Sequence, residues 1–263
     1  MSPQLYGVGL GPGAADLVTP RAIAVLRSVD VIVAPKASAF GRSVAMGIVK
    51  AAVGPVEGQE RIAVVTPMSR DPEQVRAAWE PIVATVLDRL ALGKRVAFAV
   101  EGDPMLYSSF LYLRRAMKLH RPELAIAIVP GITSVTAVAA AADTPLGDGQ
   151  ECIAILPATY TADELSSTFA RFDTTVLMKI GSNMPAVVEA LAAQRLIDKA
   201  VFVSRATQPE QRVVRDVRDA VDAYGDCFSM VIVARGERAG LLVGEVPESP
   251  QGTFENEVSD VDR

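Results

Sequence analysis

Four short segments of this chain place residues that can bind a ligand directly after apolar runs. They are residues 7–13 (GVGLGPG), 101–109 (EGDPMLYSS), 129–134 (VPGITS) and 204–212 (SRATQPEQR). Glycine lets a ligand approach the backbone without meeting a Cβ, and a helix start that carries Thr133 and Ser134 favours carboxylate groups. Asp103 can accept hydrogen bonds, and arginines such as Arg205 suit anions. All four segments fall at the carboxyl ends of expected strands, beyond which ligands of open α/β sheets bind.

The glycine-rich segment 7–13 also fits a dinucleotide fingerprint. Gly9, Gly11 and Ala14 occupy the G-x-G-x-x-A positions after the first apolar run. Against this, Pro12 removes a backbone N–H from the turn, and the next apolar run ends in Ala-Pro-Lys instead of an acid that could bind a ribose. Lys36 would suit a 2′-phosphate, so an NADP-binding oxidoreductase stays open as an alternative. A tight turn without a ligand also stays open, as does ordinary helix capping for the other segments.

Apolar runs and helical patterns alternate along the chain, which predicts an α/β fold. The runs are continuous and rich in Val and Ile, as in parallel strands that are buried on both faces. Strands are expected at residues 5–8, 30–34, 61–65, 95–100, 125–129, 152–156, 174–178, 201–204 and 229–234. Helices are expected at residues 20–28, 43–53, 72–92, 106–119, 132–142, 162–170, 184–194 and 217–223. We therefore expect mainly parallel sheets with helices on both faces, an αβα arrangement.

The polar segment 120–123, which contains Pro122, is the clearest break in this pattern. It predicts an N-terminal α/β domain at residues 1–119 and a C-terminal one at residues 125–244, each of ordinary domain size. One continuous sheet is the alternative. Residues 245–263 lose the apolar period and hold six acids and one base, so we expect an acidic disordered tail there. This tail accounts for the net charge of −5, which leaves the rest of the chain neutral.

The composition disfavours several classes of protein. Half of the 263 residues are apolar and 22% are charged, so the chain can bury a core and is not disordered by composition. The net charge disfavours a nucleic-acid binder, and one histidine with two cysteines disfavours a His/Cys metal site. We expect both cysteines to be reduced, in a cytoplasmic protein. No signal peptide is expected at the start, and the most apolar stretch, residues 135–142, is too short to span a membrane.

These motifs resemble those of the tetrapyrrole methylases, which are S-adenosylmethionine-dependent enzymes, many of them in corrin and sirohaem synthesis. The resemblance covers about residues 4–240 and rests on GVGLGPG at 7–13, LVT at 17–19, GDP at 102–104, PGITS at 130–134 and RATQPEQR at 205–212. Within the family, the chain is most similar to the precorrin-2 C20-methyltransferases. The segments that carry this finer resemblance are VAPKAS at 33–38, GDPMLYSSFLYL at 102–113 and LMKIG at 177–181.

The resemblance implies two α/β domains of the class III methyltransferase type, an active site in the cleft between them, and a homodimer. It also implies that a folded S-adenosylmethionine is bound mostly by backbone atoms. The residues at matching cofactor positions are Gly102, Asp103, Met105, Leu106, Tyr107, Thr133, Ser134, Met178, Lys179, Ala206 and Met230. Those expected beside the tetrapyrrole are Gly9, Gly11 and Pro12, together with Lys36 and Arg205 for its carboxylates.

The implied reaction is methylation of C20 of precorrin-2, which gives precorrin-3A in cobalamin synthesis. It needs no metal, because the sulfonium of S-adenosylmethionine already makes the methyl group electrophilic. No base is identified: Asp103 and Tyr107 are candidates near the site, and His120 is a poor one because it lies in the expected linker. The alternatives are cobalt-factor II as the substrate, another tetrapyrrole methylase, a methylase of RNA or protein, and a non-catalytic tetrapyrrole-binding protein. We expect no nucleic-acid or membrane partner.

Overall fold

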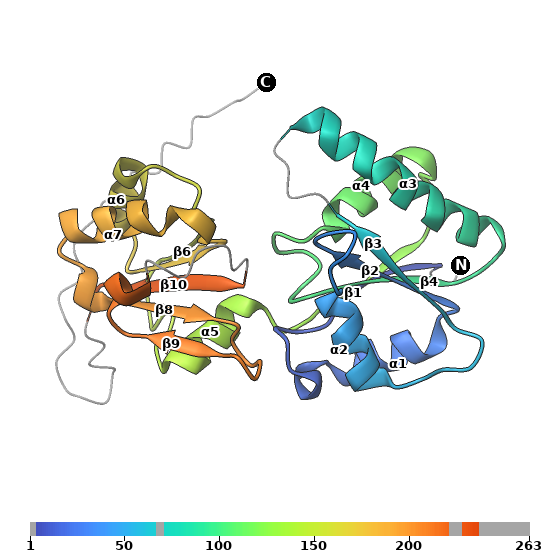
Figure 1. Ribbon diagram of the computed structural model, residues 1–263, viewed down its shortest axis with the longest axis horizontal. Coiled ribbons are helices and arrows are strands. Elements are labelled where there is room, and N and C mark those ends of the chain that lie inside the picture. Colours follow the sequence, from blue (N-terminus) through green and yellow to red (C-terminus); the bar gives the residue numbers. More distant parts are fainter. Residues whose placement is uncertain (1–3, 67–70, 221–227, 237–263) are drawn as a thin grey trace, which may run out of the picture.

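The strands of the computed structural model, which describes residues 4–66, 71–220 and 228–236, form two five-stranded sheets that lie side by side (Figure 1). The first sheet has the order β3-β2-β4-β1-β5 and the second β6-β7-β10-β8-β9. The strands of the first sheet are β1 (Leu5–Gly9), β2 (Val31–Lys36), β3 (Glu60–Val65), β4 (Val96–Val100) and β5 (Ile126–Val129). Those of the second are β6 (Ile153–Pro157), β7 (Thr174–Met178), β8 (Ala200–Ser204), β9 (Arg212–Val214) and β10 (Ser229–Ala234). Each expected strand is present, which confirms the α/β class.

Helices cover both faces of the first sheet. α1 (Pro20–Ser28) and α2 (Val44–Val53) lie on one face, and α3 (Pro72–Ala91) and α4 (Phe110–His120) lie on the other (Figure 1). Each pair closes its own cluster of buried apolar side chains against the strands. The strands between them, such as β4, are buried along their whole length.

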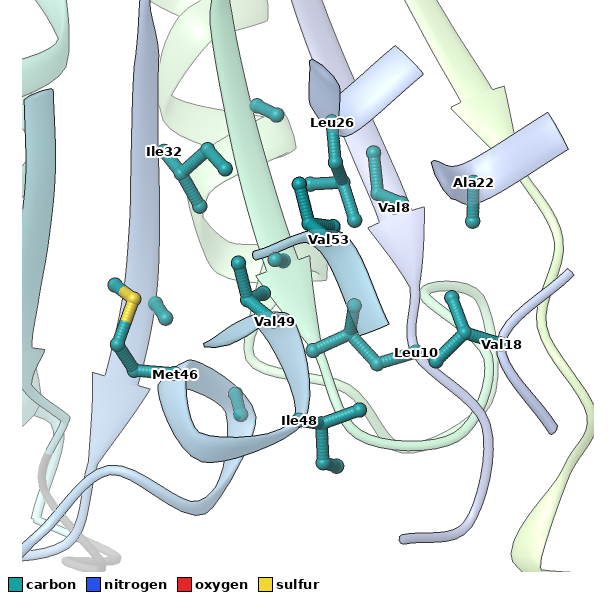
Figure 2. Close-up of a cluster of buried hydrophobic side chains, with 14 of the residues drawn as sticks. Val8, Leu10, Val18, Ala22, Leu26, Ile32, Met46, Ile48, Val49 and Val53 are labelled. Atoms are coloured by element: carbon teal, nitrogen blue, oxygen red, sulfur yellow. The ribbon is translucent and has the colours of Figure 1, made fainter. Parts of the chain in front are cut away.

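Helix starts in this unit follow the capping signals of the sequence. The Thr19 hydroxyl accepts a hydrogen bond from the N–H of Ala22 at 3.2 Å, and Pro20 occupies the first turn of α1. Ser43 caps α2 in the same way, through the N–H of Met46. Figure 2 shows the cluster that these two helices bury against the sheet, in which Val8, Leu10, Val18, Ala22, Leu26, Ile32, Met46, Ile48, Val49 and Val53 are labelled.

The second sheet is also covered on both faces. α6 (Ala162–Arg171) and α7 (Met184–Ala193) pack on one face, and α5 (Ser134–Ala142) packs on the other (Figure 1). Thr161 and Glu164 form a reciprocal capping box at the start of α6. The expected αβα arrangement is therefore confirmed for both sheets.

The strand directions differ from expectation in the second sheet. Every pair in the first sheet is parallel, but in the second sheet only β6 and β7 are parallel. β10 runs antiparallel to β7 and β8, and the short strand β9, which the sequence pattern does not predict, runs antiparallel to β8. The expectation of a mainly parallel sheet is therefore wrong for this half. A continuous apolar run indicates that a strand is buried on both faces, as β7 and β8 are. It does not indicate whether the strand runs parallel or antiparallel to its neighbours.

The boundary between the sheets differs from the predicted domain boundary at residues 120–124. β5 pairs in parallel with β1, so residues 126–129 belong to the first sheet, and residues 120–124 connect α4 to β5 within it. The chain crosses to the second sheet at residues 130–133, because α5 packs there. A polar turn with proline marks a loop but does not show whether the loop lies within a domain or between two. We propose units of residues 4–129 and 134–236.

Two expectations fall wholly or partly outside the described residues. The acidic tail expected at residues 245–263 lies wholly outside them. The helix expected at residues 217–223 lies partly outside them, and its described part, Val217–Ala220, forms a 3-10 turn. Within the described part of the chain, no helix is both long enough and apolar enough to cross a membrane.

Three glycines bring the carboxyl ends of β1, β4 and β5 into backbone contact. A Cβ on Gly9 would lie 2.6 Å from the carbonyl oxygen of Gly102 and 2.6 Å from the amide nitrogen of Gly131. A Cβ on Gly131 would meet the same carbonyl oxygen and would lie 2.9 Å from the Cα of Gly9. A side chain at position 9 or 131 would therefore force these loops apart, so the close approach at this edge requires glycine.

We expect Gly131→Ala to lower the free energy of unfolding by about 1–3 kcal/mol, the usual cost of overpacking, because its added Cβ meets backbone atoms that have little room to shift. Gly47→Ala is the matched control, since Gly47 lies within α2 and no heavy atom lies within 4 Å of where its Cβ would be. That change should raise stability by up to about 1 kcal/mol through helix propensity. Urea unfolding followed by circular dichroism measures both variants, and equal midpoints would contradict the glycine contact.

Candidate active site

A cleft with a cavity volume of about 200 Å³ lies between the two units, and its wall includes residues from the carboxyl ends of β4, β7 and β8. Each of the four segments singled out from the sequence contributes to its wall. The lining residues are Pro12, Val100, Glu101, Gly102, Asp103, Leu106, Tyr107, Ser108, Ser109, Thr133, Ser134, Val138, Met178, Lys179, Arg205, Ala206, Gln208, Phe228 and Met230. Segments far apart in the chain therefore come together at one place.

The carboxylate of Asp103 joins two of the loops that form the cleft. Its Oδ1 accepts a hydrogen bond from the N–H of Met105 at 2.8 Å, within the loop between β4 and α4. Its Oδ2 accepts one from the N–H of Gly131 at 3.0 Å, in the segment that crosses between the sheets. Gly11 and Gly102 add two backbone hydrogen bonds, with N–O distances of 3.3 and 2.7 Å. The loops after β1, β4 and β5 are thus held as one surface.

Two hydrogen bonds cross from the first unit to the second beside the cleft. The Tyr107 hydroxyl donates to the carbonyl oxygen of Ile155 on β6 at 3.2 Å, and the N–H of Ala14 donates to the Thr207 hydroxyl at 3.2 Å. The Lys179 ammonium also lies 5.9 Å from the centroid of the Tyr107 ring, within cation–π range. Tyr107 therefore connects the two walls.

Strained backbone gathers around this cleft. Tyr107, Lys179 and Arg205 line it with φ angles of 48°, 56° and 51°, and Thr207 beside them has a φ of 70°. Left-handed backbone is costly for a residue with a Cβ, so the surrounding structure must hold these conformations in place. Such strain is typical of functional sites, where it fixes side chains before a ligand arrives.

The structure places the residues predicted at the cofactor positions in this wall, apart from Met105. That side chain is not part of the lining, and Met105 is 47% exposed. The remaining ten are Gly102, Asp103, Leu106, Tyr107, Thr133, Ser134, Met178, Lys179, Ala206 and Met230. The first unit contributes the loop after β4, the second unit contributes the ends of β7 and β8, and the start of α5 joins them.

The residues predicted beside the substrate are only partly brought together. Pro12 and Arg205 line the cleft, while Gly9 and Gly11 support it through their backbone contacts. Lys36 ends β2 at the same edge of the first sheet but is not part of the lining, and its ammonium donates to a loop carbonyl at 2.8 Å.

The two base candidates, Asp103 and Tyr107, are both engaged in the architecture of the cleft. Both oxygens of the Asp103 carboxylate accept hydrogen bonds from backbone N–H groups, and the Tyr107 hydroxyl donates to a backbone carbonyl. These contacts favour a role in positioning for both residues.

Sequence reasoning includes Glu101 in the segment 101–109 but gives its carboxylate no role in the wall. Side chains alternate along β4, and Ala97 and Ala99 pack in the cluster with α1 and α2, so Glu101 points to the same side. Its Oε1 accepts a hydrogen bond from the N–H of Ala45 in the first turn of α2, at 2.9 Å. The signal that could have found it is a charge directly after a wholly apolar strand and before Gly102.

Burial raises the pKa of the Glu101 carboxyl above its ordinary value of 4.5. Hydrogen bonds from its own N–H and from that of Ala45 oppose this shift, since they favour the ionised form. Among the described residues, no charged side chain contributes to the shift, so its cause is the loss of water around the carboxyl group on burial. Glu101 is thus a carboxyl group of the cleft whose affinity for a proton is increased by burial.

The wall offers the kinds of groups that an adenosyl group joined to an amino acid would contact. The start of α5, where Ser134 follows the cap residue Thr133, offers backbone N–H groups to a carboxylate. Gly102 has a φ of 67°, and the nearest heavy atom to where its Cβ would be is the Ser134 nitrogen at 3.9 Å, so a ligand can approach the backbone. The apolar side chains suited to a nucleoside are Leu106, Val138, Met178, Ala206 and Met230.

The dinucleotide alternative fits less well. In that type of site, the glycine turn opens directly into a helix whose N-terminus holds the pyrophosphate. Here α1 begins only at Pro20, after the 3-10 turn Ala15–Leu17, so the glycine turn at residues 11–13 does not meet a helix start.

We expect Asp103→Ala to lower stability by about 1–3 kcal/mol, because the N–H groups of Met105 and Gly131 lose their acceptor. Binding of S-adenosylhomocysteine should weaken as well, since the two loops would no longer be joined. Asp148→Ala, at an exposed aspartate outside the cleft lining, should change neither property. Urea unfolding and isothermal titration calorimetry measure both, and an unchanged Asp103→Ala variant would contradict this role.

The raised pKa of Glu101 predicts how Glu101→Gln changes stability with pH. The native state holds the Glu101 proton more tightly than the unfolded chain, so the wild-type protein loses this contribution as pH rises from about 4.5 through the raised pKa. Glutamine stays neutral and its carbonyl can still accept from Ala45. The variant should therefore gain stability relative to wild type as pH rises through that range. If the difference in unfolding free energy between the two proteins did not change with pH, burial would not raise the pKa of Glu101. Urea unfolding at pH 4, 6 and 8 measures it.

Comparison with known sequences places the chain among methylases. It matches the family model of the Tetrapyrrole (Corrin/Porphyrin) Methylases over residues 4–222. Cobalamin biosynthesis protein CobIJ of Mycobacterium tuberculosis is 38% identical over 250 residues, which are 92% of this chain and 48% of that protein. The chain thus spans about half the length of this relative.

Two further relatives are matched over nearly their whole length. The cobalt-precorrin-2 C(20)-methyltransferase of Salmonella typhimurium is 33% identical over 222 residues, 84% of this chain and 92% of that enzyme. The precorrin-2 C(20)-methyltransferase of a Sinorhizobium species is 32% identical over 237 residues, 88% of this chain and 94% of that enzyme.

Solved structures show the same fold. The cobalt precorrin-4 methyltransferase CbiF has a TM-score of 0.66 at 26% identity, covering 88% of this chain and 94% of that one. Uroporphyrin-III C-methyl transferase from Thermus thermophilus, complexed with S-adenosylhomocysteine, has a TM-score of 0.61 at 20% identity, covering 88% and 97%. Since the family model covers most of the chain and near-full-length relatives exceed 30% identity, the chain belongs to the tetrapyrrole methylases, which use S-adenosylmethionine.

Proposed function

We propose that this protein methylates C20 of metal-free precorrin-2, giving precorrin-3A in cobalamin biosynthesis. The observation that carries the proposal is a cleft built from four strand-end motifs, in a chain whose near-full-length relatives are named for methylation at C20. One relative is named for the cobalt-containing substrate and one for the metal-free form. The choice of the metal-free substrate is therefore a separate part of the proposal, which needs its own test.

The residues of the cleft support binding of the methyl donor. The N-terminus of α5 and Ser134 would hold the carboxylate of the amino-acid end, and the backbone at Gly102 would lie against the ligand. Met178 and Met230 would pack against the adenosine. When bound, S-adenosylmethionine supplies an electrophilic methyl group on a sulfonium. The protein then contributes mainly orientation, because C20 of precorrin-2 belongs to an electron-rich, enamine-like system and is itself the nucleophile.

Basic residues of the second unit suit the substrate. Precorrin-2 carries several acetate and propionate carboxylates, which arginine binds in bidentate fashion and lysine as a point charge. Lys179 is exposed at the wall and Arg205 is half-buried there, each held by left-handed backbone after the end of a strand. These two side chains are our candidates for carboxylate contacts in the cleft.

We expect transfer of one ¹³C-labelled methyl group from S-adenosylmethionine to precorrin-2, with the label at C20 in the carbon NMR spectrum of the product. Cobalt-factor II, offered at the same concentration, should react with a kcat/KM at least about tenfold lower, a difference of about 1.4 kcal/mol in transition-state stabilisation. The reverse preference would overturn the metal-free assignment, and a label at another carbon would overturn the C20 assignment.

A parallel assay tests the class of substrate. Ribosomal RNA and a mixture of unfolded proteins replace the tetrapyrrole, with the same labelled donor. Label in either of them, together with none in precorrin-2 or cobalt-factor II, would replace the proposed function by a methylase of RNA or protein. The homodimer and the cytoplasmic location implied by the resemblance stay predictions, and native mass spectrometry measures the first.

A further inference from the structure

Glu101 is a carboxylate of the cleft to which the proposed function gives no part. It lines the cavity together with three other charged side chains, Asp103, Lys179 and Arg205. Asp103 is occupied on both oxygens by backbone N–H groups. In the described part of the chain, Glu101 bonds to another residue through Oε1 alone, which accepts from the N–H of Ala45. An acceptor oxygen of Glu101 is therefore left for a ligand.

Glu101 belongs to the lining of the cavity, and in the described part of the chain no other residue donates a hydrogen bond to Oε2. The carboxyl group is nevertheless surrounded closely enough for burial to raise its pKa. A lining residue whose carboxyl is partly shielded from water is in the environment in which a carboxylate becomes a stronger base.

The position of Glu101 within the cleft suits a proton acceptor. It directly precedes Gly102 and Asp103, which we place beside the methyl donor, and its side chain points toward the start of α2. The hydrogen bond from Ala45 fixes Oε1 and hence the plane of the carboxylate, while the N-terminal turn of α2 favours its ionised form. Because Ala45 holds Oε1, Oε2 is the oxygen that is left to take up a proton.

We propose that Glu101 is the catalytic base of the methyl transfer and accepts the proton that C20 loses. This assignment rests on the proposed function. C20 gains a bond to the methyl carbon, and the electron pair of the methyl–sulfur bond stays with sulfur as the sulfonium becomes a neutral thioether. The macrocycle then carries the positive charge until its C20–H bond breaks. The electron pair of that bond returns to the ring system, and the proton goes to Oε2 of Glu101.

The test compares wild type with Glu101→Gln, which keeps an acceptor for Ala45 but cannot take the proton. We expect kcat for precorrin-2 to fall by about 10²–10⁴-fold, the usual contribution of a general base, with KM changed less than about twofold. Binding of S-adenosylhomocysteine, measured by calorimetry, should stay within about twofold of wild type. Glu57→Gln, at an exposed glutamate outside the lining, is the matched control and should behave as wild type.

An isotope effect separates proton removal from positioning. With precorrin-2 deuterated at C20, the wild-type rate should change little, because the base removes the proton quickly. In Glu101→Gln, proton loss to water becomes slow, so the isotope effect on kcat should rise. Glu101→Asp, which keeps a carboxylate, should recover part of the lost kcat.

Each contrary result has a distinct meaning. Full activity of Glu101→Gln, or an isotope effect equal to wild type, would overturn the assignment of the base. A loss of S-adenosylhomocysteine binding in the variant would overturn it as well, because Glu101 would then act through the shape of the cofactor site. Failure of the wild-type protein to methylate precorrin-2 or cobalt-factor II would instead overturn the proposed function.

Discussion

Backbone contact among Gly9, Gly102 and Gly131 is the constraint on which the cleft depends. Neighbouring strands of a sheet lie about 4.8 Å apart, and side chains normally separate the loops that follow them. Here the loops after β1, β4 and β5 touch directly, because a Cβ at positions 9 or 131 would lie within 3 Å of backbone atoms. The loop after β5 is also the segment that crosses to the second sheet. The same contact that closes the edge of the first sheet therefore sets where α5 begins, and with it the position of the opposite wall.

The two walls of the cleft are built by different physical means. The first unit uses glycine, which removes side chains so that loops approach one another, and Asp103, whose carboxylate ties those loops with hydrogen bonds. The second unit uses Lys179 and Arg205 in left-handed backbone, each of which costs about 1–3 kcal/mol and needs the rest of the fold to hold it. Buried strands β7 and β8 lie directly before these residues and supply that support. Rigid strands thus end in short strained turns, so the side chains have defined positions before a ligand binds.

Much of the fold could be predicted from the sequence, because the residues that mark buried strands and helix starts are close together in the chain. Apolar runs locate the strands, and cap residues such as Thr19 locate the starts of helices. Strand direction is not local: β10 lies between β7 and β8 and runs against both, although its apolar run looks like theirs. The residues of the cleft likewise differ in whether a local sequence signal identifies them. The motifs rich in Gly, Asp and Thr can be read directly from the sequence. The raised pKa of Glu101 cannot, because it depends on burial in the packed structure, and its hydrogen bond comes from Ala45, which lies 56 residues away in the chain.

The cleft presents charges of both signs, and the two reactants of the proposed reaction also differ in sign. The donor carries a positive sulfonium and the tetrapyrrole carries several carboxylates. The anionic side chains of the lining, Glu101 and Asp103, belong to the loop after β4, whereas the cationic ones belong to the turns after β7 and β8. Charges of opposite sign in the lining therefore come from opposite units. A net charge for the whole chain does not report this arrangement, because its −5 is held by residues 245–263 and the remainder is balanced. In the proposed reaction, transfer of the methyl group moves positive charge from sulfur to the macrocycle, and a carboxylate fixed in a partly desolvated wall would stabilise that charge more strongly than water would.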